Sequence, residues 1–92
     1  MTTEKRKDAT TGFVNRAVLE IIDLAKDKAI KRGFDPRKIS RVEAGDRLSD
    51  GTIFWIKVCE KQHAEKSSGQ IEFFEDVWSR GYFWPLYIRV TF

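Results

Sequence analysis

The stretch from Thr11 to Gly33 repeats its apolar residues at the spacing of an α-helix, and no other feature limits the possible folds as strongly. One side of this helix collects six apolar residues: Val14, Ala17, Val18, Ile21, Leu24 and Ala25. The opposite side collects Arg16, Glu20, Asp23 and Asp27. Leu19 and Ile30 widen the apolar arc, so a sheet is better suited than a single helix to cover it. We expect one helix within residues 11–33 that buries Val14, Val18, Ile21 and Ala25.

The residues around this stretch define its ends and the domain boundary. Thr10 or Thr11 can cap the start of the helix, because a hydroxyl oxygen accepts from free backbone N–H groups. Gly33 suits the left-handed residue that follows a helix. Residues 1–10 are polar and basic, and we expect a flexible basic N-terminal arm there. Residues 11–92 are expected to form a single α+β domain.

Later stretches alternate apolar and polar residues, as β-strands do. They are "ISRVEA" (39–44), "TIFWIKVCE" (52–60) and "YFWPLYIRVTF" (82–92). Pro85 has no N–H group, so it belongs at the beginning of its strand, at an edge or at a bulge. The segment "QIEFFEDVW" (70–78) fits either a strand or a capped helix that stops at Gly81, and we favour the strand.

This order of elements predicts an α+β fold. One N-terminal α-helix packs on a curved antiparallel sheet of three to four strands, in α-β-β-β-β order. The side of the sheet beneath the helix should hold the core, since alternate residues of a strand point to the same side. Its members are Phe54, Ile56, Val58, Ile71, Phe73, Tyr82, Trp84, Leu86, Ile88, Val90 and Phe92.

The other side of the sheet is the predicted binding site. One helix covers one face only, so the second face should present large aromatic residues to solvent, and such patches mark interaction sites. The candidate protein-binding residues are Trp55, Lys57, Phe74, Phe83, Tyr87 and Arg89, with Ile53 and Cys59 on the same side. As an alternative, the sheet curls or the N-terminal arm folds over this face.

The charge distribution suggests a second class of partner. Residues 1–41 hold eleven Lys/Arg against six Asp/Glu, whereas residues 42–92 hold six against eight. A basic segment between Lys26 and Arg41 could contact phosphates. Its candidate nucleic-acid-binding residues are Lys26, Lys31, Arg32, Arg37, Lys38 and Arg41. Protein recognition ranks first, because the aromatic half is net negative and Glu72 and Asp76 share the side of the aromatic residues.

The sequence contains no catalytic, cofactor-binding or metal-binding motif. Cys59 and His63 stand without a ligand cluster or an orienting third group, so we expect both to be chemically ordinary. We expect a non-enzymatic binding module with a protein partner or a second copy of itself, and a small enzyme or enzyme subunit is the remaining alternative. With a single cysteine, no secretory signal and no apolar run of roughly 18 residues, the expected location is cytoplasmic, without a membrane partner.

Overall fold

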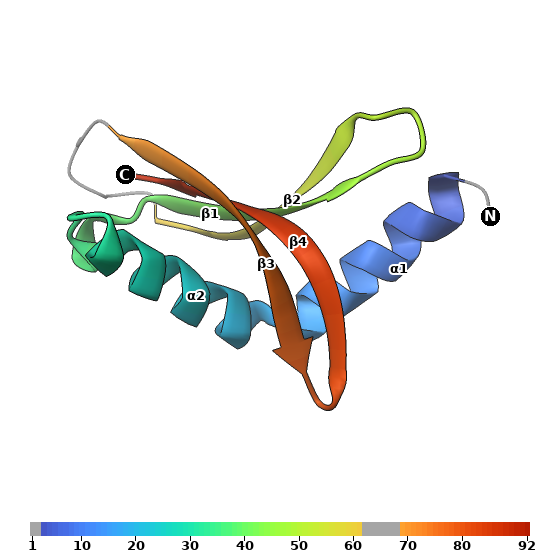
Figure 1. The fold of residues 1–92 in the computed structure, drawn as a ribbon, viewed down its shortest axis with the longest axis horizontal. Coiled ribbons are helices and arrows are strands. Elements are labelled where there is room, and N and C mark those ends of the chain that lie inside the picture. Colours follow the sequence, from blue (N-terminus) through green and yellow to red (C-terminus); the bar gives the residue numbers. More distant parts are fainter. Residues whose placement is uncertain (1–2, 62–68) are drawn as a thin grey trace.

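The computed structural model describes residues 3–61 and 69–92, and it has an α+β fold. Helices α1 (Thr3–Arg16) and α2 (Val18–Lys31) precede a 3₁₀ turn, η1 (Pro36–Lys38). The four strands are β1 (Arg41–Arg47), β2 (Ile53–Glu60), β3 (Gln70–Ser79) and β4 (Tyr82–Thr91). They form one antiparallel sheet in the order β2-β1-β4-β3, and both helices lie against the same face of it (Figure 1). The predicted fold class is confirmed.

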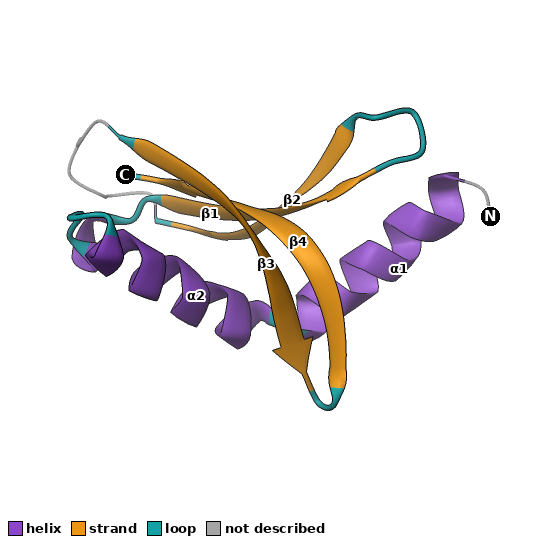
Figure 2. Cartoon of the chain, in the orientation of Figure 1, coloured by secondary structure: helices purple, strands orange, loops and turns teal. Residues whose placement is uncertain are grey.

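The helical region is two helices rather than the single one that the sequence predicts. The break falls at Ala17, where φ is −109° and ψ is 20°. Backbone hydrogen bonds still cross it, from Ala17 N–H to the Phe13 carbonyl at 3.0 Å and from Ile21 N–H to the Ala17 carbonyl at 3.0 Å. The break is therefore a bend, which lets the helix pair follow the curved sheet (Figure 2). Of the residues predicted to be buried, Val14, Ile21 and Ala25 are fully buried and Val18 is partly buried.

The expected N-terminal arm is wrong for residues 3–10, which form the first turns of α1. The buried carboxylate of Asp46 on β1 holds them in place: the Thr10 hydroxyl donates to it at 2.8 Å and Arg6 Nη2 donates to it at 3.1 Å. A buried charge is costly unless it is paired and hydrogen-bonded, and these donors satisfy that requirement. Thr10 and Thr11 are therefore not N-caps, because both lie within α1, where the Thr11 hydroxyl donates to the Lys7 carbonyl and the Thr10 hydroxyl faces the Arg6 carbonyl as well as Asp46.

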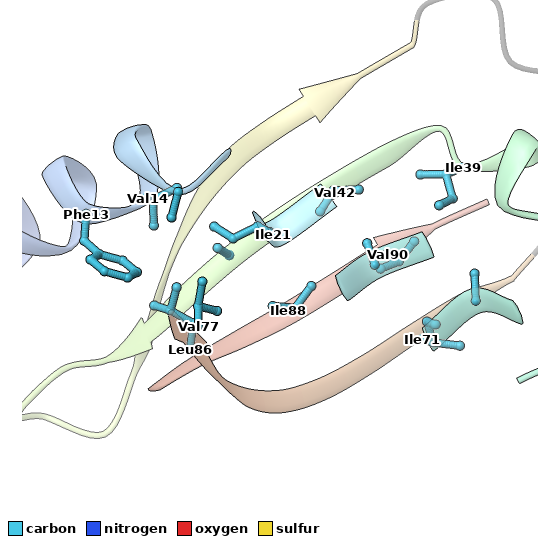
Figure 3. Close-up of a cluster of buried hydrophobic side chains, with 14 of the residues drawn as sticks. Phe13, Val14, Ile21, Ile39, Val42, Ile71, Val77, Leu86, Ile88 and Val90 are labelled. Atoms are coloured by element: carbon cyan, nitrogen blue, oxygen red, sulfur yellow. The ribbon is translucent and has the colours of Figure 1, made fainter. Parts of the chain in front are cut away.

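The core lies between the helices and the inner face of the sheet. From β4, Leu86, Ile88 and Val90 are fully buried (Figure 3). Phe92, just beyond the end of β4, is nearly fully buried. Burying such a side chain contributes roughly 1.5–3 kcal/mol. The other core predictions hold for Ile71, which is buried, and partly for the four half-buried residues Phe54, Ile56, Val58 and Phe73.

Residues 70–79 form strand β3, so the helical alternative for this segment is wrong. A two-residue turn joins β3 to β4, with positive φ at both Arg80 (53°) and Gly81 (84°). Positive φ at both positions is the mark of a type I′ turn, whose twist suits a β-hairpin. Pro85 of β4 lies opposite Asp76 of β3. It lies beyond Tyr87, the last residue of β4 that pairs with β1, so its missing N–H leaves no gap in the β1–β4 ladder.

None of the helices in residues 3–61 and 69–92 is long and apolar enough to cross a membrane.

Candidate protein-binding face

The face of the sheet opposite α1 and α2, here called the outer face, carries all six predicted protein-binding residues. The strand register aligns them in two cross-strand rows. The aromatic row runs Trp55, Gly45, Tyr87, Phe74 across β2, β1, β4 and β3. The charged row beside it runs Lys57, Glu43, Arg89, Glu72. Phe83 lies further along β4, opposite Trp78.

Arg89 is the centre of the charged row and is held on two sides. Its Nε and Nη2 donate to the two carboxylate oxygens of Glu43 at 3.0 and 3.2 Å. Its guanidinium also lies 4.1 Å from the centre of the Trp55 ring, within range of a cation–π contact. The hydrogen bonds to Glu43 raise the pKa of Arg89. Arg89 is thus a fixed part of the face and is already neutralised by a carboxylate.

Gly45 allows Trp55 to lie flat on the neighbouring strand. A Cβ atom built at Gly45 would approach Trp55 Cε3 to 2.8 Å and Ile53 Cγ2 to 2.7 Å, closer than real Cβ contacts. Trp55 is half-buried as a result, between the backbone of β1 and the guanidinium of Arg89. The aromatic row therefore has a packed end at Trp55 and an open end at Phe74.

The open end continues into the most exposed aromatic residues of the outer face. Phe74 packs on Tyr87 with ring centroids 4.7 Å apart, and Trp78 packs on Phe83 at 4.8 Å. Phe74, Trp78 and Phe83 are nevertheless 57%, 60% and 51% exposed. We call Phe74, Trp78, Phe83 and Tyr87 the hairpin aromatic cluster. The sequence prediction missed Trp78, although it shares the strand parity of Phe74, which would have placed it there.

The sequence predicts Tyr82 and Trp84 as core residues, and of the two only Trp84 is even partly buried. Trp84 is half-buried against Phe13, with ring centroids 5.7 Å apart. Tyr82 is 75% exposed, so the prediction for it is wrong. The physical reason is its position: it is the first residue after the β3–β4 turn, which projects past the junction of α1 and α2 (Figure 1). Strand parity places Tyr82 on the helix side, where it borders a depression with Phe13 and Arg16 of α1, but the end of the hairpin extends past the helices and leaves the side chain exposed.

The N-terminal residues do not cover the outer face within the described chain. Arg6 and Lys7 of α1 contact the inner side instead, where Arg6 lies over Trp84 at 5.8 Å and Lys7 over Phe54 at 5.4 Å. Both helices thus cover the same face, and among residues 5–61 and 69–92 three members of the hairpin aromatic cluster, Phe74, Trp78 and Phe83, are left open to solvent.

The basic segment lies apart from this cluster. Its residues are exposed and belong mainly to the C-terminal half of α2 and to η1: Lys26, Lys31, Arg32, Arg37 and Lys38. Arg37 pairs with Asp35 at 3.0 Å, and this pairing lowers the pKa of Asp35. Arg41 is the exception: it lies on β1 and pairs with Glu60, whose pKa is lowered by the hydrogen bond from Arg41. The structure does not join the predicted basic and aromatic sites into one surface.

Cys59 lies on the inner side of the sheet, and its outward assignment is wrong. Val42 pairs with Cys59, but the next residue, Glu43, pairs with Lys57, so Val58 is the extra residue of a β-bulge. The bulge turns Cys59 toward the core, where it is half-buried. His63 lies outside the described residues. No group of three or more His, Cys, Asp or Glu side chains in the described ranges could hold a metal ion.

Comparison with protein-family models, curated proteins and solved structures finds no match for this chain.

Proposed function

We propose that this chain is a small non-enzymatic protein-binding module that acts through the outer face of its sheet. The observation that carries the proposal is the hairpin aromatic cluster, in which Phe74, Trp78 and Phe83 are each more than half exposed side by side. Exposed apolar patches on small domains mark interaction sites, and aromatic residues dominate binding energy at protein interfaces.

The surroundings of the cluster favour binding without large rearrangement. The type I′ turn at Arg80 and Gly81 fixes the hairpin, and the ring contacts of Phe74 and Trp78 restrict their rotamers. Side chains that are ordered before binding lose less conformational entropy when the partner arrives. The cluster is therefore suited to a protein surface with matching apolar pockets.

The charges on the outer face favour a protein over a nucleic acid. Arg89 is neutralised by Glu43, and Glu72 and Asp76 lie on β3 beside the aromatic residues. A phosphate backbone would meet these carboxylates beside Phe74 and Trp78, and the cation that faces the cluster is Arg47, whose guanidinium lies 5.7 Å from the centre of the Tyr87 ring. The exposed lysines and arginines of α2 and η1 belong to elements on the other side of the sheet (Figure 1).

The proposal is tested by capture of partner proteins on the immobilised full chain after nuclease treatment, together with sedimentation of the chain alone. We expect Trp78→Ala and Phe83→Ala to abolish partner capture or self-association while the chain stays folded. The matched controls are Leu19→Ala and Ile30→Ala, which remove exposed apolar side chains (75% and 61% exposed) from α2 instead. Both controls should bind normally.

A contrary result has a clear meaning. If Trp78→Ala and Phe83→Ala bind normally while neutralising Lys31, Arg32 and Lys38 abolishes capture, and nuclease abolishes it too, the chain binds nucleic acid through its basic segment.

A further inference from the structure

Strand β3 is an edge strand with ten residues, and its backbone pattern shows which groups are free. In a two-residue type I′ hairpin the closing pair is hydrogen-bonded, which here is Ser79 with Tyr82. Hydrogen-bonded and non-hydrogen-bonded pairs alternate along an antiparallel ladder. The pair Asp76–Pro85 is then non-hydrogen-bonded, which agrees with the missing N–H of proline.

The same alternation leaves every second residue of β3, counted back from Trp78, with backbone N–H and C=O groups directed away from β4. They are Glu72, Phe74, Asp76 and Trp78, on which the proposed site is centred, and the alternation continues to a fifth such residue, Gln70, at the far end of the strand. In the described part of the chain no strand pairs with this side of β3. An unpaired edge is a template for an added strand, and extended peptides bind proteins in this way.

Helix α2 runs beneath this edge and forms a groove with it. Glu20 lies near the turn end of β3, 3.5 Å from Ser79, and Lys28 lies 3.9 Å from Glu75 in the middle of the strand. Two adjoining depressions between helix and strand are lined by Glu20, Asp23, Leu24 and Asp27 of α2 and by Phe74, Glu75, Asp76 and Trp78 of β3. Their apolar members, Leu24, Phe74 and Trp78, lie among carboxylates.

The groove carries a strong negative charge in a chain whose net charge is +3. Glu20, Asp23, Asp27 and Asp76 line it, and no lysine or arginine does. Among residues 5–61 and 69–92 none of these four carboxylates forms an ion pair; the one nearby pair joins Lys28 to Glu75. A basic ligand complements this charge.

A second copy of β3 does not complement the negative charge of the groove. The strand "QIEFFEDVWS" contains Glu72, Glu75 and Asp76 and neither lysine nor arginine. Pairing two such edges would bring like charges together, which destabilises cross-strand neighbours.

We propose that the free edge of β3 binds an extended basic segment of a partner protein as a fifth strand. Every second residue of this partner segment is lysine or arginine, with its side chain directed toward α2. The residues between them are apolar and pack beside Phe74 and Trp78. The spacing agrees: Asp23 and Asp27 are about 6 Å apart along the helix axis, and alternate residues of a strand are about 6.7 Å apart. This inference rests on the proposed function, because it gives the chemistry of one protein partner.

The test uses the full ¹⁵N-labelled chain and the synthetic peptide KVKVKVK. We expect binding that slows hydrogen exchange of the backbone amides of Glu72, Phe74, Asp76 and Trp78 by about tenfold or more, because these N–H groups gain partners. Two control peptides should bind at least about tenfold more weakly: KKKKVVV, which has equal charge without alternation, and KVKVKVK with N-methyl groups on alternate residues.

Protein variants separate the groove from general charge attraction. Asp27→Lys should weaken KVKVKVK binding by about tenfold, whereas Asp8→Lys makes the same charge change on α1 and should leave it unaltered. Equal binding of KVKVKVK and KKKKVVV, or no binding, would overturn the inference. Protection of the four amides in the concentrated chain without peptide would also overturn it, since the occupant would then be a second copy. Loss of partner capture with Phe83→Ala would still support the proposed function if the peptide failed.

Discussion

The substitution Gly45→Ala tests the packing that supports the outer face. The new Cβ would lie 2.7 Å from Ile53 Cγ2 and 2.8 Å from Trp55 Cε3. Neither neighbour is the free end of a flexible chain: Ile53 is β-branched and therefore stiff at χ1, and the ring of Trp55 lies under the guanidinium of Arg89. Overpacking of this kind costs about 1–3 kcal/mol.

A smaller gain opposes this cost. Replacing glycine by alanine within a strand reduces the conformational entropy lost on folding and contributes about 0.5–1 kcal/mol. We therefore expect Gly45→Ala to lower the free energy of unfolding by about 1–2 kcal/mol. Guanidinium unfolding followed by far-ultraviolet circular dichroism measures this change, and the near-ultraviolet signal of Trp55 should change with it.

Gly12→Ala is the matched control. Its Cβ would meet Arg16 Nη1 at 3.5 Å, an ordinary contact, so this change within α1 should stabilise the chain by about 0.5–1 kcal/mol. In a Trp55→Ala background, Gly45→Ala should cost at least about 0.5 kcal/mol less than in the unaltered chain. Strict additivity of the two changes, or stabilisation by Gly45→Ala equal to that by Gly12→Ala, would refute the packing described for Trp55.

Three further predictions concern the core, the Asp46 cluster and the acid range. Ile88→Ala leaves a cavity at a fully buried site and should lower the free energy of unfolding by about 2–5 kcal/mol; a loss below about 1 kcal/mol in thermal denaturation would contradict this placement. Thr10→Val removes the hydroxyl that donates to buried Asp46 and should cost about 1–3 kcal/mol in urea unfolding. The pKa of Glu60 is lowered in the folded chain by Arg41, so its contribution to stability is present above its unfolded pKa and lost as pH falls through the folded value. Glu60→Gln should therefore be less stable than the unaltered chain at neutral pH and equally stable in acid, as measured by unfolding at a series of pH values.

Much of the fold could be predicted because the relevant signals are local. Alternation in β4 placed Leu86, Ile88 and Val90 in the core, and the helical spacing placed Ile21 and Ala25 there. The first turns of α1 could not be predicted, because residues 3–10 have little apolar periodicity of their own. Their order depends on Asp46, which is 36 positions from Thr10 in the chain.

The candidate site also contains residues that local signals placed correctly and residues that they did not. Strand parity alone put Trp55, Tyr87 and Arg89 on one face; in the structure Arg89 lies over Trp55, and Gly45 of β1 separates Trp55 from Tyr87. Parity failed for Cys59, because a bulge in β2 reverses the direction of the residues beyond it. It also failed for Tyr82, because parity gives the side of the sheet on which a residue lies but not how far the helices extend along that side.

The sequence by itself determined the α+β class and the two sides of the strands, because the direction of a side chain follows from the backbone period of its own element. Only the tertiary structure decided which of the outward aromatic residues are open to solvent. Trp55 is covered because Gly45 and Arg89 come from two other strands, whereas Phe74 and Trp78 lie on an edge strand that has a neighbour on one side only. The acidic groove likewise exists only because α2 runs beneath that edge, which brings Asp23 and Asp27 close to Asp76 and Trp78.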